Sequence, residues 1–480
     1  MTTPANPLEL VDGRTAEPAV ALAGVLEDPD DGSLLGTQRA SAPAAVERAL
    51  AAAAAAWEGG GWSDLPADAR AGALRRLAAA LDARAEEIAL LDAIDSGVPL
   101  AVMRLFAAGL GDQVRAVADE LLAAGEARPL AAAGRRVEVL RRPWGPALLL
   151  TPWNAPAAAA VGKLANALAA GCPAILKPSE LAPSFTRPLA AAVLEAELPP
   201  GALQVVHGGA EVAQRLVADG RVRAVALIGG QATGRAVAAA AAPRMAALQL
   251  ELGGSNAAIV AADADVGAAA AALAAGMTKL NGQWCEAPRR VFVAAQRHDE
   301  LVDALRAALA SMTVGSLRDA ATAVGPLAHR AHHARVRAQL AALGGEAHAT
   351  APAPTGDGFF LSPTVVVGAA PEAAAEELFG PVISVHAVAS EEEAVRRANA
   401  NGDGLAGYVF AGDRERAFAL ASRLHCGEVR IGGTNVLDLA AGSTQSFWGA
   451  SGIGAHGARE QLEAFRGSRV VGEEDPALPL

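Results

Sequence analysis

The spacing of apolar residues changes along the chain, and these changes predict where strands and helices lie. Residues 1–40 combine short apolar runs with turn signals, including a tight turn at 28–32, and predict short strands. From 44 to 125 the chain is rich in alanine and predicts helices, and the helical stretch over 73–100 is broken at Gly97 and Pro99. The apolar residues that recur there at helical intervals are Leu74, Leu77, Leu81, Ile88 and Leu91. We interpret these helices as packing elements.

The middle of the chain begins with a strand pattern. Residues 134–150 alternate polar and apolar side chains and end in a wholly apolar run at 147–150. A Pro-Trp-Asn-Ala-Pro turn, a helix over 157–170 and a second apolar strand at 174–176 follow. Together these segments predict one β-α-β unit.

The same alternation then repeats. It consists of an apolar run at 201–209, a helix over 211–218, an apolar strand at 224–230 and another helix from Gly234. Units of this kind predict an α/β fold, in which a parallel sheet carries helices on both faces.

Beyond residue 290 we expect further strands and helices in a less regular order. A helix is expected over 299–309, an extended loop over 313–329, and a charged, solvent-facing helix over 390–401. Strands are expected as a pair joined by a turn at 356–368, and singly at 404–412 and 426–433. A helix and an apolar strand with Val470 and Val471 end the chain.

Length and composition restrict the class of protein. A chain of 480 residues is too long for one ordinary hydrophobic core, so we expect two or three domains. With 52% hydrophobic and 19% charged residues, the composition is that of a folded, soluble protein. The net charge of −12 disfavours a nucleic-acid partner, because phosphate binding requires concentrated Lys and Arg.

Neither a membrane anchor nor a secretion signal is expected. The sequence has no uninterrupted apolar run of about 18 to 20 residues. Its N-terminus lacks a basic segment followed by an apolar one. The three cysteines, Cys172, Cys285 and Cys426, form no disulfide or metal-binding spacing. We therefore expect a cytoplasmic protein without a metal site.

Cys285 is the candidate nucleophile. A lone cysteine is more often a small buried apolar residue than a catalyst, because free cysteine packs well in cores. This cysteine, however, lies between a helical segment and the apolar run 291–293, among polar neighbours that are poor core material. These neighbours are Asn281, Gly282, Gln283, Glu286 and Arg289.

Glu251 is the candidate proton acceptor. It lies between Leu250 and Leu252, directly before a Gly-Gly pair and 34 residues before Cys285. A carboxylate at the end of an apolar strand is either a structural acceptor for backbone N–H groups or a general base with a raised pKa.

Several strand ends carry residues suited to a nucleotide. Lys177 and Glu180 directly follow an apolar strand, which suits ribose hydroxyls, although such residues are also commonly solvated. Gly229, Gly230 and Gly234 precede or open a helix whose N-terminal amides would face a phosphate. The sequence has no GxGxxG motif after a strand.

The order of these motifs resembles that of the NAD(P)-dependent aldehyde dehydrogenase superfamily. The two signature motifs are LELGG and GQxC, at 250–254 and 282–285. The segments PWN, LKPSE, LPPG, VVHG, ELFGPVISV and SGIG occur in the family's order with similar spacing. The resemblance covers roughly residues 20–470.

The resemblance implies an aldehyde dehydrogenase-like α/β fold with a Rossmann-like, parallel-sheet cofactor domain, an α/β catalytic domain and a small bridging segment. The NAD-binding domain would comprise 1–123 and 144–250, and the catalytic domain 251–448. The bridging segment would comprise 124–143 and 449–480, extend a sheet across a subunit boundary and make a homodimer or homotetramer.

The resemblance also implies a reaction. Cys285 would attack an aldehyde as a thiolate, which requires a lowered pKa or a nearby proton acceptor. Asn154 and the backbone N–H of Cys285 would hold the oxyanion. Hydride transfer to NAD would leave a thioester. Glu251 would activate the water that hydrolyses this thioester to a carboxylic acid.

The cofactor contacts are likewise implied by the resemblance. They are Trp153, Lys177, Ser179, Glu180, Gly229, Gly230, Gly234, Leu252, Gly253, Glu377 and Phe379. Lys177 and Glu180 would meet the adenosine ribose, and Glu377 and Phe379 the nicotinamide ribose and ring. A carboxylate at Glu180 would repel a 2′-phosphate, so NAD is favoured and NADP remains possible.

Departures from the family pattern concern the phosphate and substrate sites. Gly230 stands where the family usually has a serine, and Ala155 stands where a bulky aromatic residue is frequent. With Trp284 on the other side, and Phe447 as a candidate lining of the substrate tunnel, we expect a bulky apolar or aromatic aldehyde. Arg430 is expected at a surface or interface. The alternative is that it binds the anionic tail of a substrate.

Two other functions remain open. A CoA-acylating relative would transfer the acyl group to CoA rather than to water, but such relatives typically lack the glutamate base. A non-catalytic binding or structural protein is made conceivable by the altered phosphate loop. Retention of Cys285, Glu251 and Asn154 favours the hydrolytic enzyme.

Overall fold

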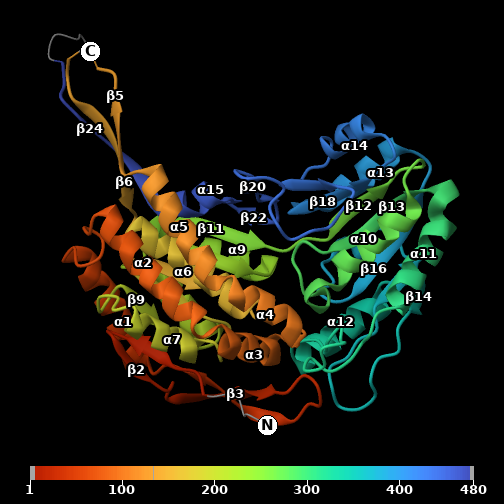
Figure 1. Cartoon of the computed structure of the whole chain (residues 1–480), viewed down its shortest axis with the longest axis horizontal. Coiled ribbons are helices and arrows are strands. Elements are labelled where there is room, and N and C mark those ends of the chain that lie inside the picture. Colours follow the sequence, from red (N-terminus) through yellow and green to blue (C-terminus); the bar gives the residue numbers. More distant parts are fainter. Residues whose placement is uncertain (1–5, 133, 476–480) are drawn as a thin grey trace.

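The computed structural model describes residues 6–132 and 134–475. Residues 1–5 and 476–480, at the ends of the first and last expected segments, lie outside the described residues, as does residue 133. Two α/β bodies lie side by side, and an arm of strands projects from the first of them (Figure 1).

The first body is built on an eight-stranded sheet with the order β2-β1-β9-β8-β7-β10-β11-β22. Its five central strands are parallel: β9 Leu203–Val205, β8 Ala174–Lys177, β7 Ala147–Leu150, β10 Ala224–Gly229 and β11 Ala247–Leu252. Its edges are antiparallel: β1 Glu9–Val11, β2 Arg14–Ala16 and β22 Gly452–Ile453.

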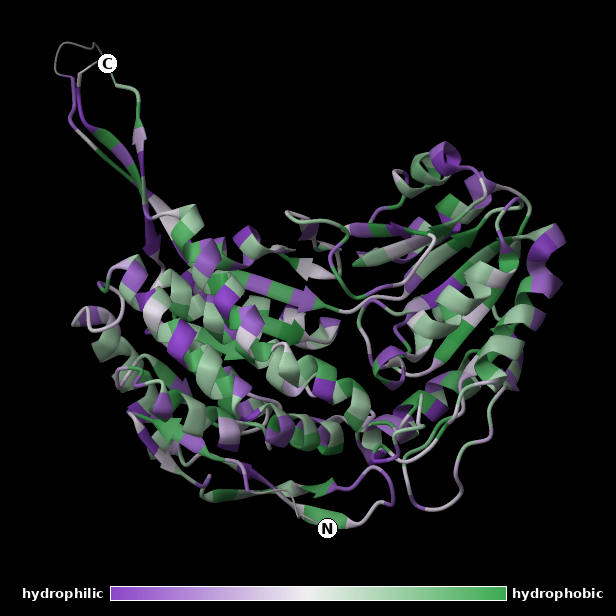
Figure 2. Ribbon diagram, in the orientation of Figure 1, coloured by the Kyte–Doolittle hydropathy of each residue, from purple (hydrophilic) through white to green (hydrophobic). Residues whose placement is uncertain are grey.

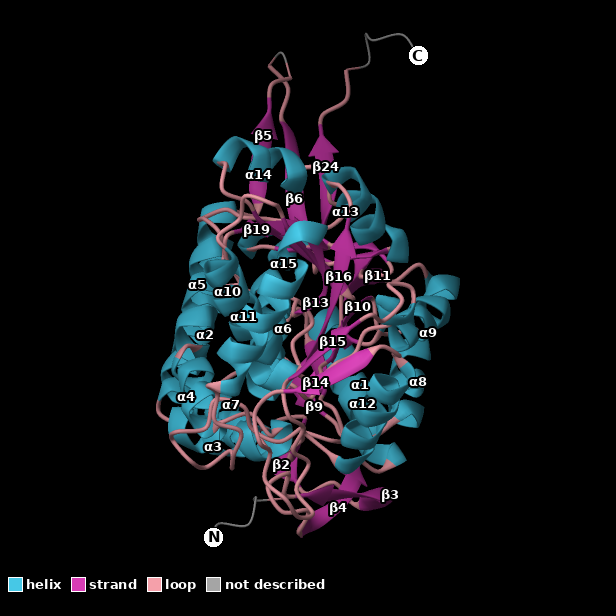
Figure 3. Ribbon diagram, turned by 90° about the vertical axis from the view of Figure 1, so that its right-hand side faces the viewer, coloured by secondary structure: helices cyan, strands magenta, loops and turns pink. Residues whose placement is uncertain are grey.

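Helices cover both faces of this sheet (Figure 3). One face carries α2 Ala67–Asp82, α3 Ala85–Ser96, α4 Leu100–Ala108, α5 Leu110–Ala124, α6 Pro156–Ala170 and α7 Thr186–Glu195. The other carries α1 Pro43–Glu58, α8 Ala210–Ala218 and α9 Gln231–Ala241. Alternate strand residues face opposite layers: Leu149 belongs to the first core and Leu148 to the second.

The second body has a seven-stranded sheet with the order β14-β15-β16-β13-β12-β18-β19. The strands are β14 Glu346–Ala349, β15 Thr364–Val367, β16 Val382–Val388, β13 Pro288–Ala294, β12 Asn256–Val260, β18 Ala406–Phe410 and β19 Glu428–Ile431. One face packs on α10 Val266–Thr278 and α11 His298–Ala310, the other on α13 Glu391–Ala398 and α14 Arg414–Ala421. Helix α12 Arg330–Ala342 packs beside β15 and β16.

The arm is a three-stranded antiparallel sheet with the order β24-β6-β5. Its strands are β24 Arg466–Gly472, β6 Val137–Pro143 and β5 Ala127–Leu130. It joins the segment before β7 to the end of the chain and extends away from both bodies (Figure 1). Val470 and Val471 of β24 are exposed.

Smaller elements complete the fold. The hairpin of β3 Val20–Glu27 and β4 Leu34–Ala40 lies at the N-terminal side, and α15 Ala458–Glu463 packs on α5 and α6. The two-residue pairs are β17 Asp403–Gly404 with β21 Trp448–Gly449, and β20 Gln445–Ser446 with β23 Ala455–His456.

The expected α/β fold is confirmed, and the β-α-β unit over 147–177 is correct nearly to the residue. The central strands of both sheets are mostly apolar, and the covering helices carry polar residues on their outer sides (Figure 2). No helix in the described part of the chain combines the length and apolar content needed to cross a membrane.

The break expected at Gly97 and Pro99 separates α3 from α4, and a further break at Arg84, with φ −115° and ψ 6°, separates α2 from α3. Two local predictions were wrong. Helix α9 begins at Gln231 rather than at Gly234, because the extended Gly230 already caps it. Only 364–367 of the expected strand pair at 356–368 is a strand, since Pro363 directly before it has no N–H for pairing.

Candidate active site

The candidate catalytic residues lie where the two bodies face each other. Asn154 follows β7 in the turn before α6, and Glu251 is the penultimate residue of β11. The carboxyl ends of these parallel strands share one edge of the first sheet. Cys285 lies in the loop 279–287 between α10 and β13, here called the nucleophile loop. This loop reaches that edge, because Asn154 Nδ2 donates to the Gln283 carbonyl at 2.8 Å.

The nucleophile loop has a left-handed backbone over three successive residues. Leu280, Asn281 and Gly282 have φ values of 49°, 59° and 75°. The first two are strained, because a side chain makes this conformation costly.

Amide side chains hold this strained backbone in place. Asn281 Nδ2 donates to the carbonyls of Gly97 and Pro326, each at 2.8 Å. Gln283 Nε2 donates to the Ser96 carbonyl at 2.9 Å, and its Oε1 accepts from Ala328 N at 2.9 Å. The side chains of Asn281 and Gln283 are therefore buried scaffold with hydrogen-bond partners.

Cys285 is a neutral thiol in this environment. Burial raises its pKa well above the ordinary value, and the charges of Glu286, Glu377 and Glu251 raise it further. A lowered pKa, one of the two conditions for reactivity stated from the sequence, is therefore absent in this form of the protein. The candidates for the other condition, a nearby proton acceptor, are the carboxylates whose charges act on the thiol.

Glu251 forms an ion pair with Lys163 of α6. Lys163 is 3% exposed, and its ammonium also donates to Gln249 Oε1 at 2.8 Å. The ion pair therefore fixes the position of the Glu251 carboxylate near the end of β11. The sequence analysis missed Lys163; the signal was a single cation in an otherwise apolar helix.

Asn154 retains a hydrogen-bond donor. Its amide nitrogen carries two N–H groups, and the Gln283 carbonyl takes one of them. Asn256, which the sequence analysis also missed, donates to the Cys285 carbonyl at 2.8 Å and to the Ala287 carbonyl at 3.0 Å. The backbone that would supply the second oxyanion donor is thus fixed from the second body.

Glu377 has the properties of a group that awaits a ligand. Its Oε1 is buried and has no hydrogen-bond partner among the described residues. Burial raises its pKa to about 7, and Arg289 opposes this rise. Gly253 lies directly against the carboxylate, so that a side chain at Gly253 would collide with it. Oε1 of Glu377 is free to accept a hydrogen bond, and Gly253 has no side chain that would block access to it. A ribose hydroxyl could donate this hydrogen bond.

Trp153 and Phe379 form an aromatic wall beside Glu377. Their ring centroids are 5.5 Å apart in an edge-to-face arrangement, and His332 lies 4.8 Å from the Trp153 ring. His332 also contacts the Phe379 carbonyl through Nε2 at 2.7 Å. The contact of Phe379 with the nicotinamide ring, which the resemblance implies, stays a prediction.

Lys177 is buried rather than solvated, so its solvated alternative is wrong. It is 6% exposed, and its ammonium donates to the carbonyls of Pro178, at 2.8 Å, and Gly208. Glu180 Oε2 lies 3.6 Å away, and Ser179 Oγ accepts from Leu181 N at 3.2 Å. Glu180 remains partly exposed at the end of β8.

The three glycines take different positions. Gly229 ends β10 and Gly230 caps α9, so both lie at the helix N-terminus. Gly234 lies inside α9, and its N–H already donates to the Gly230 carbonyl at 3.0 Å. The prediction that Gly234 presents a free N-terminal amide was wrong. A side chain at Gly234 would collide with Leu252, which is buried against α9.

The expected substrate residues are only partly brought together. Ala155, Trp284 and Cys285 pack on one apolar cluster, and Lys279 Nζ lies 4.6 Å from the Trp284 ring. Phe447 is buried, but among the described residues it does not join this cluster. Arg430 is buried in an ion pair with Glu428 at 2.7 Å, so its expected surface position was wrong.

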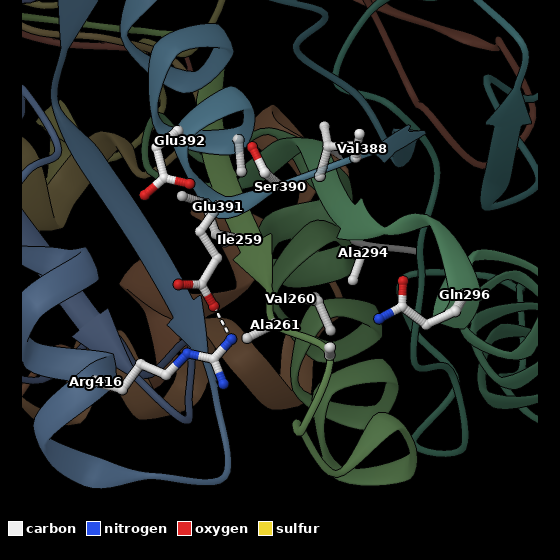
Figure 4. Close-up of a pocket in the computed structure, with 13 residues that line it drawn as sticks. Ile259, Val260, Ala261, Ala294, Gln296, Val388, Ser390, Glu391, Glu392 and Arg416 are labelled. Carbon is white, nitrogen blue, oxygen red and sulfur yellow. Dashed lines mark hydrogen bonds and ion pairs between the residues drawn. The ribbon is translucent and has the colours of Figure 1, made fainter.

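A separate pocket of about 250 Å³ lies at the opposite edge of the second sheet (Figure 4). Val260, Ala294 and Val388 line it at the carboxyl ends of β12, β13 and β16, whereas Cys285 precedes β13. An ion pair between Arg416 and Glu391 lies in its wall. Within the described residues, no group of three or more His, Cys, Asp or Glu is placed to hold a metal ion.

Comparison with known proteins identifies the family. The two bodies place the chain among doubly wound α/β proteins, whose ligands bind at the carboxyl ends of the strands. A family model described as "Aldehyde dehydrogenase family" matches residues 24–471. The geranial dehydrogenase of Castellaniella defragrans is 36% identical over 436 residues, which cover 89% of this chain and 90% of that protein.

Solved structures agree with this match. An NAD-dependent aldehyde dehydrogenase from Sinorhizobium meliloti superimposes with a TM-score of 0.92 at 28% identity, covering 99% of this chain and 97% of that one. A mutant aldehyde dehydrogenase C from Pseudomonas syringae, in complex with NAD+ and octanal, gives 0.90 at 29% identity, covering 97% and 96%.

The chain belongs to the aldehyde dehydrogenase family. It is an NAD(P)-dependent oxidoreductase that acts on aldehydes, and the resemblance found in its motifs is confirmed.

Proposed function

We propose that the protein oxidises a bulky apolar or aromatic aldehyde to its carboxylic acid with NAD, and that it releases the acid by hydrolysis. The observation that supports this most directly is the joining of Asn154, Glu251 and Cys285 at one edge of the first sheet. Asn154 is bonded to the nucleophile loop, and the charge of Glu251 acts on the Cys285 thiol.

In the first step the Cys285 sulfur bonds to the carbonyl carbon of the aldehyde. The thiol proton passes to a carboxylate, for which Glu251 is placed, and the carbonyl oxygen becomes an oxyanion. The free N–H of Asn154 and the backbone N–H of Cys285 stabilise that oxyanion, and one such donor contributes about 3 kcal/mol.

NAD, when bound, accepts the hydride that leaves the tetrahedral carbon. Glu377 would hold its nicotinamide ribose through the unsatisfied Oε1, with Trp153 and Phe379 beside the ring. The partly exposed Glu180 beside the buried Lys177 would hold the adenosine ribose hydroxyls and repel a 2′-phosphate. Gly229 and Gly230 would meet the pyrophosphate through backbone amides at the N-terminus of α9.

In the last step Glu251, which has first released the thiol proton to solvent, removes a proton from water, and the water attacks the Cys285 thioester. Glu251, which is partly buried and paired with Lys163, is placed for this role. The carboxylic acid leaves, and the Cys285 thiol is restored. A CoA-acylating enzyme has no need of such a base, and this favours hydrolysis.

The proposed substrate class rests on the side chains of Ala155 and Trp284. Ala155 carries only a methyl group, and Trp284, which directly precedes the nucleophile, packs with it on the same apolar core. A relative named geranial dehydrogenase and a structure holding octanal fit an apolar aldehyde. Highest kcat/KM for short aliphatic aldehydes would contradict this part of the proposal.

We propose a homo-oligomer, a dimer or a tetramer, assembled through the arm. Val470 and Val471 are 65% and 52% exposed on β24, an edge strand of the arm sheet. We place the protein in the cytoplasm, where its three free cysteines would stay reduced.

The test is NADH production across a panel of aldehydes, measured by absorbance, with Cys285→Ala as the control. We expect acid formation without CoA in the wild type and none in the variant, while cofactor titration shows that the variant still binds NAD. Strict dependence on CoA would favour the acylating alternative. Absence of binding of NAD and NADP at millimolar concentration would favour a non-catalytic protein.

A further inference from the structure

Arg289 is a buried cation at the point where the nucleophile loop meets the segment 376–381, here called the Glu377 loop. It is 3% exposed and lies at the start of β13, four residues after Cys285. Among the described residues no carboxylate forms an ion pair with it closer than 4 Å. Burying an unpaired guanidinium is costly, so its retention calls for a physical explanation.

Its hydrogen bonds tie two loops together. Nη1 donates to the Gly380 carbonyl at 2.5 Å, and Nη2 donates to the carbonyls of Gly282 at 2.5 Å and Trp284 at 3.2 Å. The backbones of Gly282 and Gly380 are in close contact. One planar guanidinium therefore fixes the loop that carries Cys285 against the loop that carries Glu377.

Its charge acts on the same two residues. Burial lowers the pKa of Arg289 to about 10, so it remains protonated at neutral pH, and the charges of Glu377, Tyr408 and Cys285 favour its protonated form. Attraction is mutual, so Arg289 favours the ionised forms of Glu377 and Cys285. Three carboxylates, Glu286, Glu377 and Glu251, oppose the Cys285 thiolate.

We infer that Arg289 is a positioning residue, whose guanidinium sets Cys285 against the nicotinamide site and whose charge offsets the carboxylates around the thiolate. This inference deepens the proposed function and rests on it for the roles of Cys285 and Glu377. Arg289 touches neither substrate nor cofactor in this account; it acts through the two loops.

Arg290 provides a matched control from the same strand. It is 2% exposed, its guanidinium donates to the carbonyls of Ser255, Arg397 and Ala398, and burial lowers its pKa to about 10. Its charged neighbour is Asp403 rather than Cys285 or Glu377. Replacing either arginine by methionine therefore removes a buried cation with three carbonyl contacts, but only one replacement alters the charge at the thiol.

The experiment measures alkylation of Cys285 by iodoacetamide as a function of pH, without aldehyde or cofactor. The modified peptide is identified by mass spectrometry, because Cys172 and Cys426 also carry thiols. In Arg289→Met we expect the midpoint to rise by about one pH unit or more, a tenfold slower reaction at fixed pH. In Arg290→Met and Arg289→Lys we expect it to stay within about 0.3 units of the wild type.

Steady-state kinetics test the positioning role. Arg289→Lys keeps the charge but loses the planar fork, so we expect kcat to fall at least tenfold and KM for NAD to rise, whereas Arg290→Lys changes both less than threefold.

If Arg289→Met does not fold, as judged by circular dichroism, this lysine pair decides the inference. Equal midpoints in the two methionine variants, or equal kinetics in the two lysine variants, would overturn it. A wild type that oxidises no aldehyde would refute the proposed function, while the alkylation comparison would still test the charge of Arg289.

Discussion

The carboxylates around Cys285 make its proton the main obstacle to attack. Burial and three negative charges raise the pKa of the thiol, so the thiolate forms only when a base takes the proton. Glu251, which forms an ion pair with Lys163, is placed for this task. The same carboxylate then serves in hydrolysis, which explains why one residue supports both halves of the proposed reaction.

Asn154→Ala tests the oxyanion donor. We expect kcat to fall about 10²- to 10³-fold, because one preorganised N–H is lost where negative charge develops. The measurement is the steady-state rate of NADH formation. Asn6→Ala, which removes an exposed amide bonded to Glu17, is the control and should leave the rate unchanged. A rate within threefold of the wild type in Asn154→Ala would contradict the assignment.

Glu377 predicts a pH dependence of NAD binding. Burial raises the pKa of Glu377 to about 7, so the carboxyl is protonated below pH 7 and ionised above it. The ionised form accepts a ribose hydroxyl more strongly, so we expect NAD to bind about tenfold more tightly at pH 8 than at pH 6.

Fluorescence titration of NAD at both pH values measures this effect. In Glu377→Gln the amide does not titrate, so the difference between pH 6 and pH 8 should largely disappear. The same pH step in the variant as in the wild type would assign the titration to another group.

Candidate catalytic residues could be predicted from the sequence where they lie in a motif. The residues that contact them in the folded protein could not be predicted. Cys285, Glu251 and Asn154 are recognisable from short motifs. Lys163 of α6 meets Glu251 of β11 across 88 positions of sequence, and this contact exists only in the folded chain. Gly234 was misassigned because a glycine near a helix start can serve either packing or an N-terminal amide, and the letter alone does not distinguish them.

At the scale of elements, the nucleophile loop is strained, and the fold compensates for this strain. Two non-glycine residues adopt left-handed backbone, and amide side chains from Asn281 and Gln283 bind four neighbouring backbone groups from the segments around Ser96 and Pro326. Strain that is held this firmly keeps the thiol in one position before substrate arrives. Gly282 is the point where the loop touches its neighbour.

Gly282→Ala should uncouple the nucleophile loop from the Glu377 loop. A methyl group at Gly282 would meet the backbone of Gly380 and Pro381, and φ is +75°. The conformation alone should lower the free energy of unfolding by about 1 to 2 kcal/mol, and the collision should lower kcat at least tenfold.

Gly344→Ala separates these two effects. Gly344 has φ +73° with open space around its Cα, so its variant should lose stability but keep kcat. Chemical denaturation and NADH formation measure the two quantities. Equal kcat values for the two variants would show that the contact between the loops has no role in turnover.

Elements were predictable where the hydrophobic period is strong. The strand at 147–150 and the helix after it were correct to about one residue, because an apolar run and a helical repeat with clear turn signals bound them. Element boundaries were mispredicted where a single residue sets them. The extended backbone of Gly230 lets α9 begin at Gln231, and Pro363 has no N–H for strand pairing, so the strand begins at Thr364.

At the scale of the whole molecule, the proposed active site depends on two sheets that face each other. Asn154 and Glu251 come from the first body, and Cys285 and Glu377 come from the second. The α/β architecture could be predicted from alternating strands and helices. The pairing of β24 with β6 and of β22 with β11 joins segments hundreds of residues apart, and only the family resemblance indicated the first of these pairings.

The arm predicts the state of assembly. We expect Val470→Glu combined with Val471→Glu to shift the protein toward a monomer, because the charges would be buried without partners in an interface formed by β24. Light scattering coupled to size exclusion measures the mass. Ser468→Asp, on the same exposed strand, is the control for added charge. An unchanged oligomer mass in the valine double variant would place the interface elsewhere.

The most direct test of the whole account is to trap the covalent intermediate on Cys285. Glu251→Gln should slow hydrolysis about 10²- to 10⁴-fold while still allowing hydride transfer. After mixing with aldehyde and NAD, we expect one equivalent of NADH per active site and, by peptide mass spectrometry, an acyl group on the Cys285 peptide. NADH formation with Cys285 unmodified, or an acyl group on another residue, would contradict the account.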